Sequence, residues 1–137
     1  MKACNKIFIY FVFIDEVMKM RYKLPCDLQH GILMEPNLCC VHLYGHDYQL
    51  TQQEYRLFDQ LLQSALACFG LGAPVRALSR GELLRGAWGS AADYDTRTVD
   101  VHVQRLRAKM GPDMITTVYR QGYCLNPAAI GRLAMVS

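Results

Sequence analysis

Side chains that could read a nucleic acid are concentrated in residues 95–110, DTRTVDVHVQRLRAKM. From residue 97 to residue 109 this stretch holds four Lys or Arg residues and one acid, whereas the whole chain has 15 Lys or Arg against 12 Asp or Glu. An Arg can donate two hydrogen bonds to guanine, a Gln can pair with adenine, and Val or Ala can contact the thymine methyl group. This combination favours non-covalent readout of base edges in the major groove of DNA.

A helix is the element that must position these side chains. At 100° per residue its apolar positions fall on one narrow face, which would pack on a core. The opposite arc carries Arg97, Thr98, Val101, Gln104, Arg105 and Ala108, with His102 and Lys109 along one margin and Asp100 and Arg107 along the other. Asp95 or Thr96 would cap the helix, and Gly111-Pro112 would end it. A surface helix whose basic residues only keep its face solvated would show the same pattern, so the neighbouring elements must decide.

Two capping boxes precede this basic helix. Thr51 followed by Glu54 predicts a helix to about Ala67, and Ser79 followed by Glu82 predicts a short helix to Trp88. A small antiparallel sheet is predicted before them from residues 32–34, 39–44 and 48–50, with a turn at Gly45-His46-Asp47. Residues 68–77 and 89–94 are predicted loops. After the basic helix, residues 114–119 and 123–125 are predicted to form a hairpin around Arg120-Gln121-Gly122. This order of elements is that of a winged helix.

Composition limits the alternatives. A chain of 137 residues with 52% hydrophobic residues can bury one core, and its net charge of +3 neither requires nor excludes a nucleic-acid partner. The six cysteines form no CxxC pair, so we expect reduced thiols in a cytoplasmic protein and no metal site. The apolar run 7–14 is too short to cross a membrane; we expect a buried or edge strand there, or an unstructured, adhesive extension. The four histidines have no catalytic partner at a motif spacing, so neither an enzyme nor a cofactor is expected.

Several short motifs, taken together, carry a family resemblance. In order they are Leu50-Thr51 with Glu54, Ser79-Arg80 with Glu82-Leu83-Leu84, Trp88-Gly89, Arg97-Thr98-Val99-Asp100-Val101-His102-Val103, Leu106-Arg107, Lys109, Thr117-Val118 and Gly122-Tyr123. Residues 28–125 thereby resemble the OmpR/PhoB-type DNA-binding domain of bacterial two-component response regulators. The resemblance favours the DNA-reading interpretation of the basic helix over the solvated-face alternative.

The resemblance implies an α+β fold, a winged helix-turn-helix with a small N-terminal antiparallel sheet, three helices and a C-terminal β-hairpin wing. It also implies a sequence-specific transcription regulator that binds double-stranded DNA as a homodimer, with helix 96–110 in the major groove and wing 114–125 near the minor groove. Contact with RNA polymerase through residues 89–94 is a further implication. The alternative left open is a protein-interaction module or truncated remnant with weak DNA binding, which pairs with a related regulator or with the polymerase.

Mapped residue by residue, the resemblance divides the candidate contacts into three groups. Arg105 is expected to contact bases, with Gln104 and Val101 beside it. Tyr119 and Arg120 would lie at the minor groove, although Arg120 stands one residue after the usual wing position. The expected backbone contacts are Arg97, Thr98, His102, Arg107, Lys109, Thr117, Tyr123 and Trp88. Structural alternatives remain for three of them: Trp88 in the core, Tyr123 packed under the wing and His102 in a local hydrogen bond.

The expected domain organisation departs from the family pattern at both ends. Residues 1–27 would be an N-terminal extension in place of a receiver domain, residues 28–126 the winged-helix domain, and residues 127–137 a tail without an assigned element. The stretch 63–78 is longer than in typical members, which suggests an inserted loop or a frame-shift scar. Gln104 replaces a residue that is often basic in relatives, and this change could shift base preference.

Overall fold

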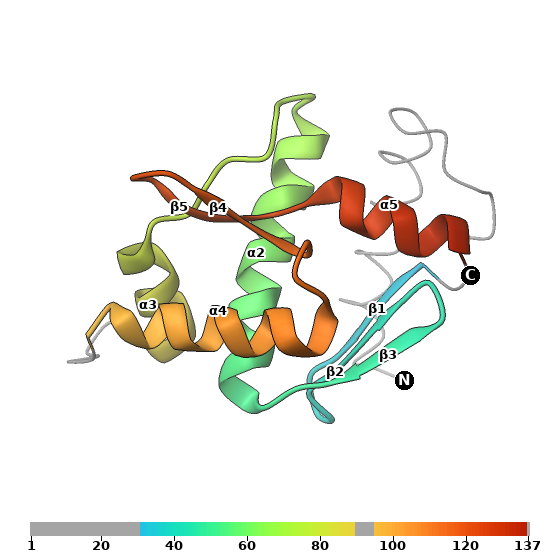
Figure 1. The fold of residues 1–137 in the computed structure, drawn as a ribbon, viewed down its shortest axis with the longest axis horizontal. Helices are drawn as coiled ribbons and strands as arrows, with labels where there is room; N and C mark the ends of the chain where they lie inside the picture. The colour runs from blue at the N-terminus through green and yellow to red at the C-terminus, as the bar shows by residue number, and fades with distance from the viewer. Residues whose placement is uncertain (1–30, 90–94, 137) are drawn as a thin grey trace.

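The chain is described here from a computed structural model that covers residues 31–89 and 95–136 (Figure 1). The predicted N-terminal run 7–14 and most of loop 89–94 lie outside these residues. The described elements, in chain order, are β1 (Ile32–Glu35), β2 (Cys40–Leu43), β3 (His46–Gln49), α2 (Gln52–Gly70), α3 (Arg80–Trp88), α4 (Arg97–Met110), β4 (Ile115–Val118), β5 (Gly122–Leu125) and α5 (Pro127–Val136). The α+β winged-helix architecture predicted from the sequence is confirmed.

Strands β1, β2 and β3 form an antiparallel sheet in that order. Its inner face buries four apolar side chains at alternating positions, as a half-buried sheet requires: Ile32, Met34, Val41 and Leu43. The tight turn between β2 and β3 is Tyr44-Gly45, and both residues have positive φ angles, 49° and 85°. The predicted turn at Gly45-His46-Asp47 is therefore displaced, because His46 and Asp47 already pair in β3 with Leu43 and His42.

The other face of this sheet carries a hydrogen-bonded histidine. The Nδ1 atom of His42 lies 2.6 Å from Asp47 Oδ1 on β3, and its Nε2 atom is hydrogen-bonded to Glu35 on β1. Burial acts to lower the pKa of His42, but the two carboxylates outweigh it and raise the pKa above its ordinary value. The imidazole thus joins all three strands on this face.

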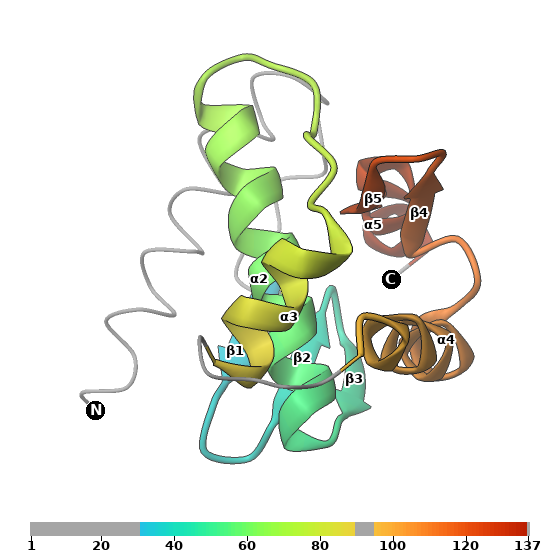
Figure 2. The same cartoon turned by 90° about the vertical axis from the view of Figure 1, so that its left-hand side faces the viewer.

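Helix α2 is the central element; in Figure 2, α3 lies in front of it, and α4, the hairpin and α5 lie to its right. Its predicted capping box is present: the Glu54 N–H donates to Thr51 Oγ1 at 3.3 Å, and the Thr51 N–H donates to Glu54 Oε1 at 3.0 Å. The helix buries Leu57, Phe58 and Leu61 almost completely. It continues to Gly70, three residues beyond the predicted end.

Helices α3 and α4 form the helix-turn-helix pair. The second capping box, Ser79 with Glu82, is also present, and Gly89 follows the end of α3 with a φ of 97°. At the start of α4, Asp95 rather than Thr96 caps the helix, because its Oδ1 atom accepts the Arg97 N–H at 3.0 Å and Thr96 makes no side-chain cap. The predicted apolar face is buried: Val99, Val103, Leu106 and Met110.

The β4–β5 hairpin is the predicted wing, with Thr117 opposite Tyr123. Its turn places Arg120 in the left-handed region, at a φ of 62°. Leu78 adds an isolated antiparallel β-bridge to β5 that was not predicted. Its N–H donates to the Tyr123 carbonyl at 2.8 Å, and its carbonyl accepts the Tyr123 N–H at 3.0 Å. Gly122 permits this approach, because a Cβ there would lie 1.9 Å from the Leu78 carbonyl oxygen. The wing is therefore joined to the segment that leads into α3.

Helix α5 occupies residues for which no element was predicted. Asn126 Oδ1 accepts the Ala128 N–H at 3.1 Å, and Pro127 takes the first helical position, which is a common way to begin a helix. Ala129 and Ile130 are buried in the common core, and α5 packs against β2. The segment is thus part of the folded body. The cysteines within the described residues, at positions 39, 40, 68 and 124, are free thiols.

Candidate nucleic-acid interface

The outward face of α4 presents the side chains predicted to contact bases. Val101 is 49% exposed, and Gln104, Arg105 and Ala108 are exposed as well. Among the described residues, the Arg105 side chain makes no hydrogen bond, ion pair or ring contact. The buried stripe on the opposite side of α4 holds this face outward.

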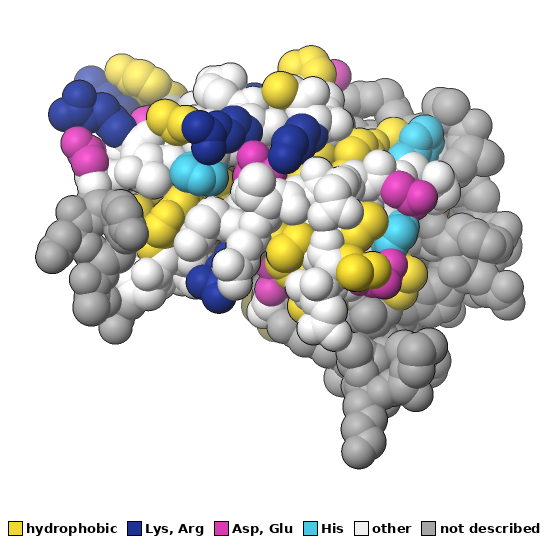
Figure 3. Space-filling model, turned by 90° about the horizontal axis from the view of Figure 1, so that it is seen from below, with side chains coloured by type: hydrophobic (Ala, Val, Ile, Leu, Met, Phe, Trp, Pro, Cys, Tyr) yellow, Lys and Arg dark blue, Asp and Glu magenta, His cyan; other side chains and the backbone are white. Residues whose placement is uncertain are grey.

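Positive charge gathers around the same face. In Figure 3, most of the visible Lys and Arg side chains lie across the left and centre of this surface, where one His and several acidic side chains also appear, and further His and acidic side chains lie to the right. Arg97 is 86% exposed at the start of α4, although its Nε atom pairs with Asp95 at 3.1 Å. The backbone N–H of Arg97, followed by its charge, holds the pKa of Asp95 below its ordinary value. This acid offsets part of the charge of Arg97.

Thr98, His102 and Trp88 form a local cluster. His102 Nδ1 lies 2.8 Å from the Thr98 carbonyl oxygen, and the indole of Trp88 meets the imidazole edge-on at a centroid distance of 4.8 Å. Trp88 is half-buried and packs against the core. These contacts are the structural alternatives considered for Trp88 and His102, and they leave each side chain partly exposed.

Lys109 connects the end of α4 to the start of α2. Its Nζ atom lies 2.5 Å from Glu54 Oε1, and the Glu54 side chain is 2% exposed while that of Lys109 is 39% exposed. Burial acts to raise the pKa of Glu54, but the hydrogen bonds from Lys109 and Thr51 hold it below its ordinary value. A residue predicted to contact the DNA backbone thus also neutralises a buried carboxylate.

Arg107 connects α4 to the wing. Its Nη2 atom donates to the Ile115 carbonyl at 2.8 Å and to Thr117 Oγ1 at 2.7 Å. Its guanidinium carbon lies 5.7 Å from the centre of the Tyr123 ring. Arg107 and Thr117, both predicted to contact the DNA backbone, are therefore hydrogen-bonded to each other.

Tyr123 is buried at 5% exposure and forms a second connection between α4 and the wing. Its hydroxyl donates to Asp100 Oδ1 at 2.5 Å, and the same oxygen accepts Arg80 Nε at 2.7 Å. Partial burial acts to raise the pKa of Asp100, but these two hydrogen bonds hold it below its ordinary value. Sequence reasoning missed this cluster, because Arg80 and Asp100 stand 20 residues apart and only the crossing of α3 and α4 brings them together.

The hairpin tip carries the two residues predicted for the minor groove. Tyr119 is 79% exposed, and the guanidinium carbon of Arg120 lies 5.1 Å from the centre of its ring. Tyr119 and Arg120 are both exposed, as Arg105 is on α4. The structure thus presents one helix face and one hairpin tip, with ordered contacts between them.

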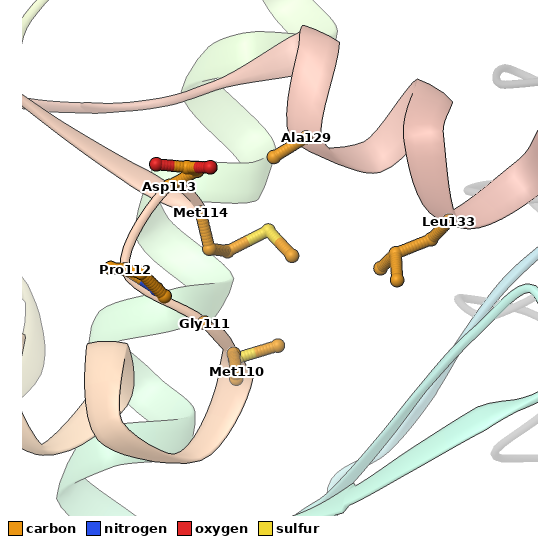
Figure 4. A pocket seen from close by; sticks show the side chains of 7 residues that line it. All are labelled: Met110, Gly111, Pro112, Asp113, Met114, Ala129 and Leu133. Carbon is orange, nitrogen blue, oxygen red and sulfur yellow. The ribbon is translucent and has the colours of Figure 1, made fainter.

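A separate apolar pocket of about 210 Å³ lies at the end of α4 (Figure 4). Met110 and Met114 line it from α4 and the following loop, and Ala129 and Leu133 line it from α5. The methionine and leucine side chains point toward the shared space in Figure 4. This pocket belongs to the seam between α5 and the rest of the fold and is distinct from the exposed face of α4.

A three-stranded sheet, a helix-turn-helix pair and a β-hairpin wing define a protein of the winged-helix class. The chain belongs to the family described as transcriptional regulatory protein, C terminal, whose pattern matches residues 45–125. That family is a class of transcription regulators rather than of enzymes. Within the described part of the chain, no helix is both long and apolar enough to span a membrane.

Curated relatives are similar to this chain over its family region. The phosphate regulon transcriptional regulatory protein PhoB of Rhizobium meliloti is 40% identical over 89 residues, which cover 62% of this chain and 35% of that protein. The transcriptional regulatory protein CseB of Streptomyces coelicolor is 55% identical over 81 residues, covering 59% and 31% respectively. The matched region therefore spans about a third of the length of these relatives.

Solved structures agree with the fold. The DNA-binding domain of the response regulator AdeR, in complex with an intercistronic region, has a TM-score of 0.54 and 27% identity, covering 70% of this chain and 93% of that chain. The DNA-binding domain of Bacillus subtilis CssR has a TM-score of 0.53 and 25% identity, covering 70% of this chain and all of that one. Both are described as DNA-binding domains.

Proposed function

We propose that this chain is the sequence-specific DNA-binding effector domain of a response-regulator-type transcription factor. In this proposal helix 96–110 enters the major groove and wing 114–125 lies near the minor groove. The observation that carries it is the outward face of α4, where the Arg105 side chain is exposed and makes no hydrogen bond, ion pair or ring contact within the described part of the protein. The family membership and the similarity to DNA-binding domains support the same conclusion.

The proposed DNA contacts fall into groups according to the exposure of each side chain and its partners within the protein. Arg105, Gln104 and Val101 are proposed to read base edges, because they are exposed on the row that faces away from the core. The exposed Arg97 is proposed to contact phosphates, which set the position of the helix rather than its sequence preference. Tyr119 and Arg120 are proposed as the wing contacts. The remaining residues are proposed to contact the DNA backbone, and each of them also has an interaction partner within the protein: Thr98, His102, Arg107, Lys109, Thr117, Tyr123 and Trp88.

Partners and setting belong to the same proposal. Binding is expected to be non-covalent and without a cofactor, in the cytoplasm, by a homodimer on repeated half-sites. The loop 89–94 is proposed to contact RNA polymerase. These statements rest on the family resemblance and on the regulators to which the chain is similar.

Selection from a duplex pool with a randomised central segment tests the proposal and identifies the target. With the recovered duplex, Arg105→Ala should cost about 1–3 kcal/mol and relax specificity at one base step, whereas Arg97→Ala should weaken binding to specific and random duplexes alike. Arg56→Ala is the matched control, because Arg56 is an exposed arginine of α2 outside α4 and the wing. Binding should weaken as salt rises, since phosphate contacts release counterions.

Two results would contradict this division of roles. Equal losses for Arg105→Ala on specific and random duplexes would remove Arg105 from base readout. Failure of the parent protein to retain any duplex at low salt would favour the alternative function, a module that pairs with a related regulator or with polymerase instead of DNA.

A further inference from the structure

Helix α4 holds the wing at two separate points. Asp100 accepts the Tyr123 hydroxyl at 2.5 Å, and Arg107 donates to Thr117 Oγ1 at 2.7 Å and to the Ile115 carbonyl. Asp100 and Arg107 are seven residues apart, so they lie on the same side of the helix, about 10 Å apart along its axis. The two anchors are therefore separated by two helical turns.

Both anchors reach the same rung of the hairpin. Thr117 and Tyr123 are direct partners in the register of β4 and β5. Each stands three residues from Arg120, on opposite sides of the turn, so the anchored rung is the base of the wing tip. The backbone pairing of Tyr123 with Leu78 joins this rung to the segment before α3, and the two side-chain anchors add what fixes its direction relative to α4.

Arg80 completes the anchor at Tyr123. It binds the same Asp100 oxygen at 2.7 Å, and its guanidinium carbon lies 5.6 Å from the centre of the Tyr123 ring, where that of Arg107 lies at 5.7 Å. The ring is thus within cation–π range of two arginines, and its hydroxyl is taken by a carboxylate. Helix α3, helix α4 and the wing meet at this one side chain.

Asp100 is the single acidic residue of α4, the helix that faces a polyanion in the proposed function. A carboxylate there opposes the phosphates that the neighbouring arginines attract, so electrostatic attraction does not explain its contribution. Its contribution lies in geometry, because a single oxygen aligns two donors from two different elements.

We propose that Asp100 is a positioning residue: acting through Tyr123, and together with Arg107 acting through Thr117, it fixes the wing tip relative to α4. Arg120 and Arg105 then engage one duplex at the same time. This inference rests on the proposed DNA-binding function. It predicts energetic coupling in DNA binding between Arg120 and the Asp100–Tyr123 contact, although Arg120 makes no hydrogen bond or ion pair with either residue.

A double-mutant cycle tests the coupling, using the duplex recovered from the randomised pool and the full chain. Tyr123→Phe removes only the hydroxyl that Asp100 accepts, and Tyr48→Phe removes a hydroxyl from the distant β1–β3 sheet as a control. Arg120→Ala should reduce affinity on the order of tenfold in the parent and in Tyr48→Phe, but by less than about threefold in Tyr123→Phe. Asp100→Asn keeps the acceptor and should preserve the tenfold effect, whereas Asp100→Ala should abolish it.

Circular dichroism establishes that each variant is folded, and Tyr123→Phe decides the question if Asp100→Ala does not fold. Equal costs of Arg120→Ala in the parent and in Tyr123→Phe would overturn the positioning role while leaving the proposed function intact. An Arg120→Ala variant that binds like the parent would also overturn it, because no wing contact would then need positioning. A parent that retains no duplex would overturn both proposals.

Discussion

The buried carboxylate of Glu54 offers a direct test of how α4 is joined to the rest of the fold. Its Oε1 atom accepts the Thr51 N–H at 3.0 Å and Lys109 Nζ at 2.5 Å, and the side chain is 2% exposed. Glu54→Ala removes the capping box, worth about 1 kcal/mol, and a charge-assisted hydrogen bond, worth about 1.5–3 kcal/mol. Because Lys109 is 39% exposed, its ammonium group can be hydrated in the Glu54→Ala variant, and this hydration offsets part of the lost stabilisation.

The expected loss in free energy of unfolding is about 3 kcal/mol for Glu54→Ala and about 1 kcal/mol for Glu54→Gln, which keeps an acceptor but not the charge. Urea unfolding monitored by circular dichroism measures both. Thermal unfolding should show Tm lower by about 15 °C for Glu54→Ala. Gln52→Ala is the matched control, because Gln52 is exposed in the same helical turn and should change stability by less than about 0.5 kcal/mol.

The contribution of Glu54 should depend on pH in a defined direction. Its folded pKa is lowered, so the stabilisation is fully present above the unfolded pKa, about 4.3, and is lost as pH falls through the folded pKa. The stability difference between parent and Glu54→Gln should therefore be constant near neutral pH and shrink in acid. Identical urea midpoints for these two proteins at pH 7 would refute the reasoning.

Two further predictions concern the sheets. Because the folded pKa of His42 is raised, its contribution to the free energy of unfolding is fully present below the unfolded pKa, about 6.5, and is lost as pH rises through the folded pKa. The urea midpoints of the parent and of His42→Gln should therefore differ more at pH 6 than at pH 9. Gly122→Ala should destabilise the fold by about 2–3 kcal/mol and remove hydrogen-exchange protection at the Leu78 amide, because its Cβ would overlap the Leu78 carbonyl. Gly45→Ala, which shares a positive φ but has open space around it, should cost only about 1 kcal/mol; equal losses for both glycine variants would show that backbone strain, and not the overlap, is responsible.

Local features of the fold were predictable from the sequence because their causes are local. The capping boxes at Thr51 and Ser79 each depend on side chains three residues apart, and the structure confirms both. The buried face of α4 follows from helical periodicity alone. Helix α5 was missed although Asn126-Pro127 is a start signal, because the segment after it is short and carries no polar face to reveal its period.

The contacts that organise the candidate interface were not predictable, because they join elements that are distant in sequence. Lys109 and Glu54 are 55 positions apart, and Asp100 and Tyr123 are 23 apart. Helical periodicity placed Arg105 on the outward arc and Arg107 on its margin, but it could not show that the fold engages Arg107 with Thr117. Which basic residues remain available to a ligand is decided by tertiary packing.

The backbone pairing of Leu78 with Tyr123 bears on how this domain tolerates change. The pairing uses main-chain atoms, so it places no demand on the identity of the residues that precede it between positions 71 and 77. Insertions and deletions can accumulate in that loop as long as the strand edge at Leu78 stays in register. A protein engineer could therefore graft a peptide or a label at the exposed Leu71-Gly72 turn, before the core contact of Val75, and leave the geometry of the wing unchanged.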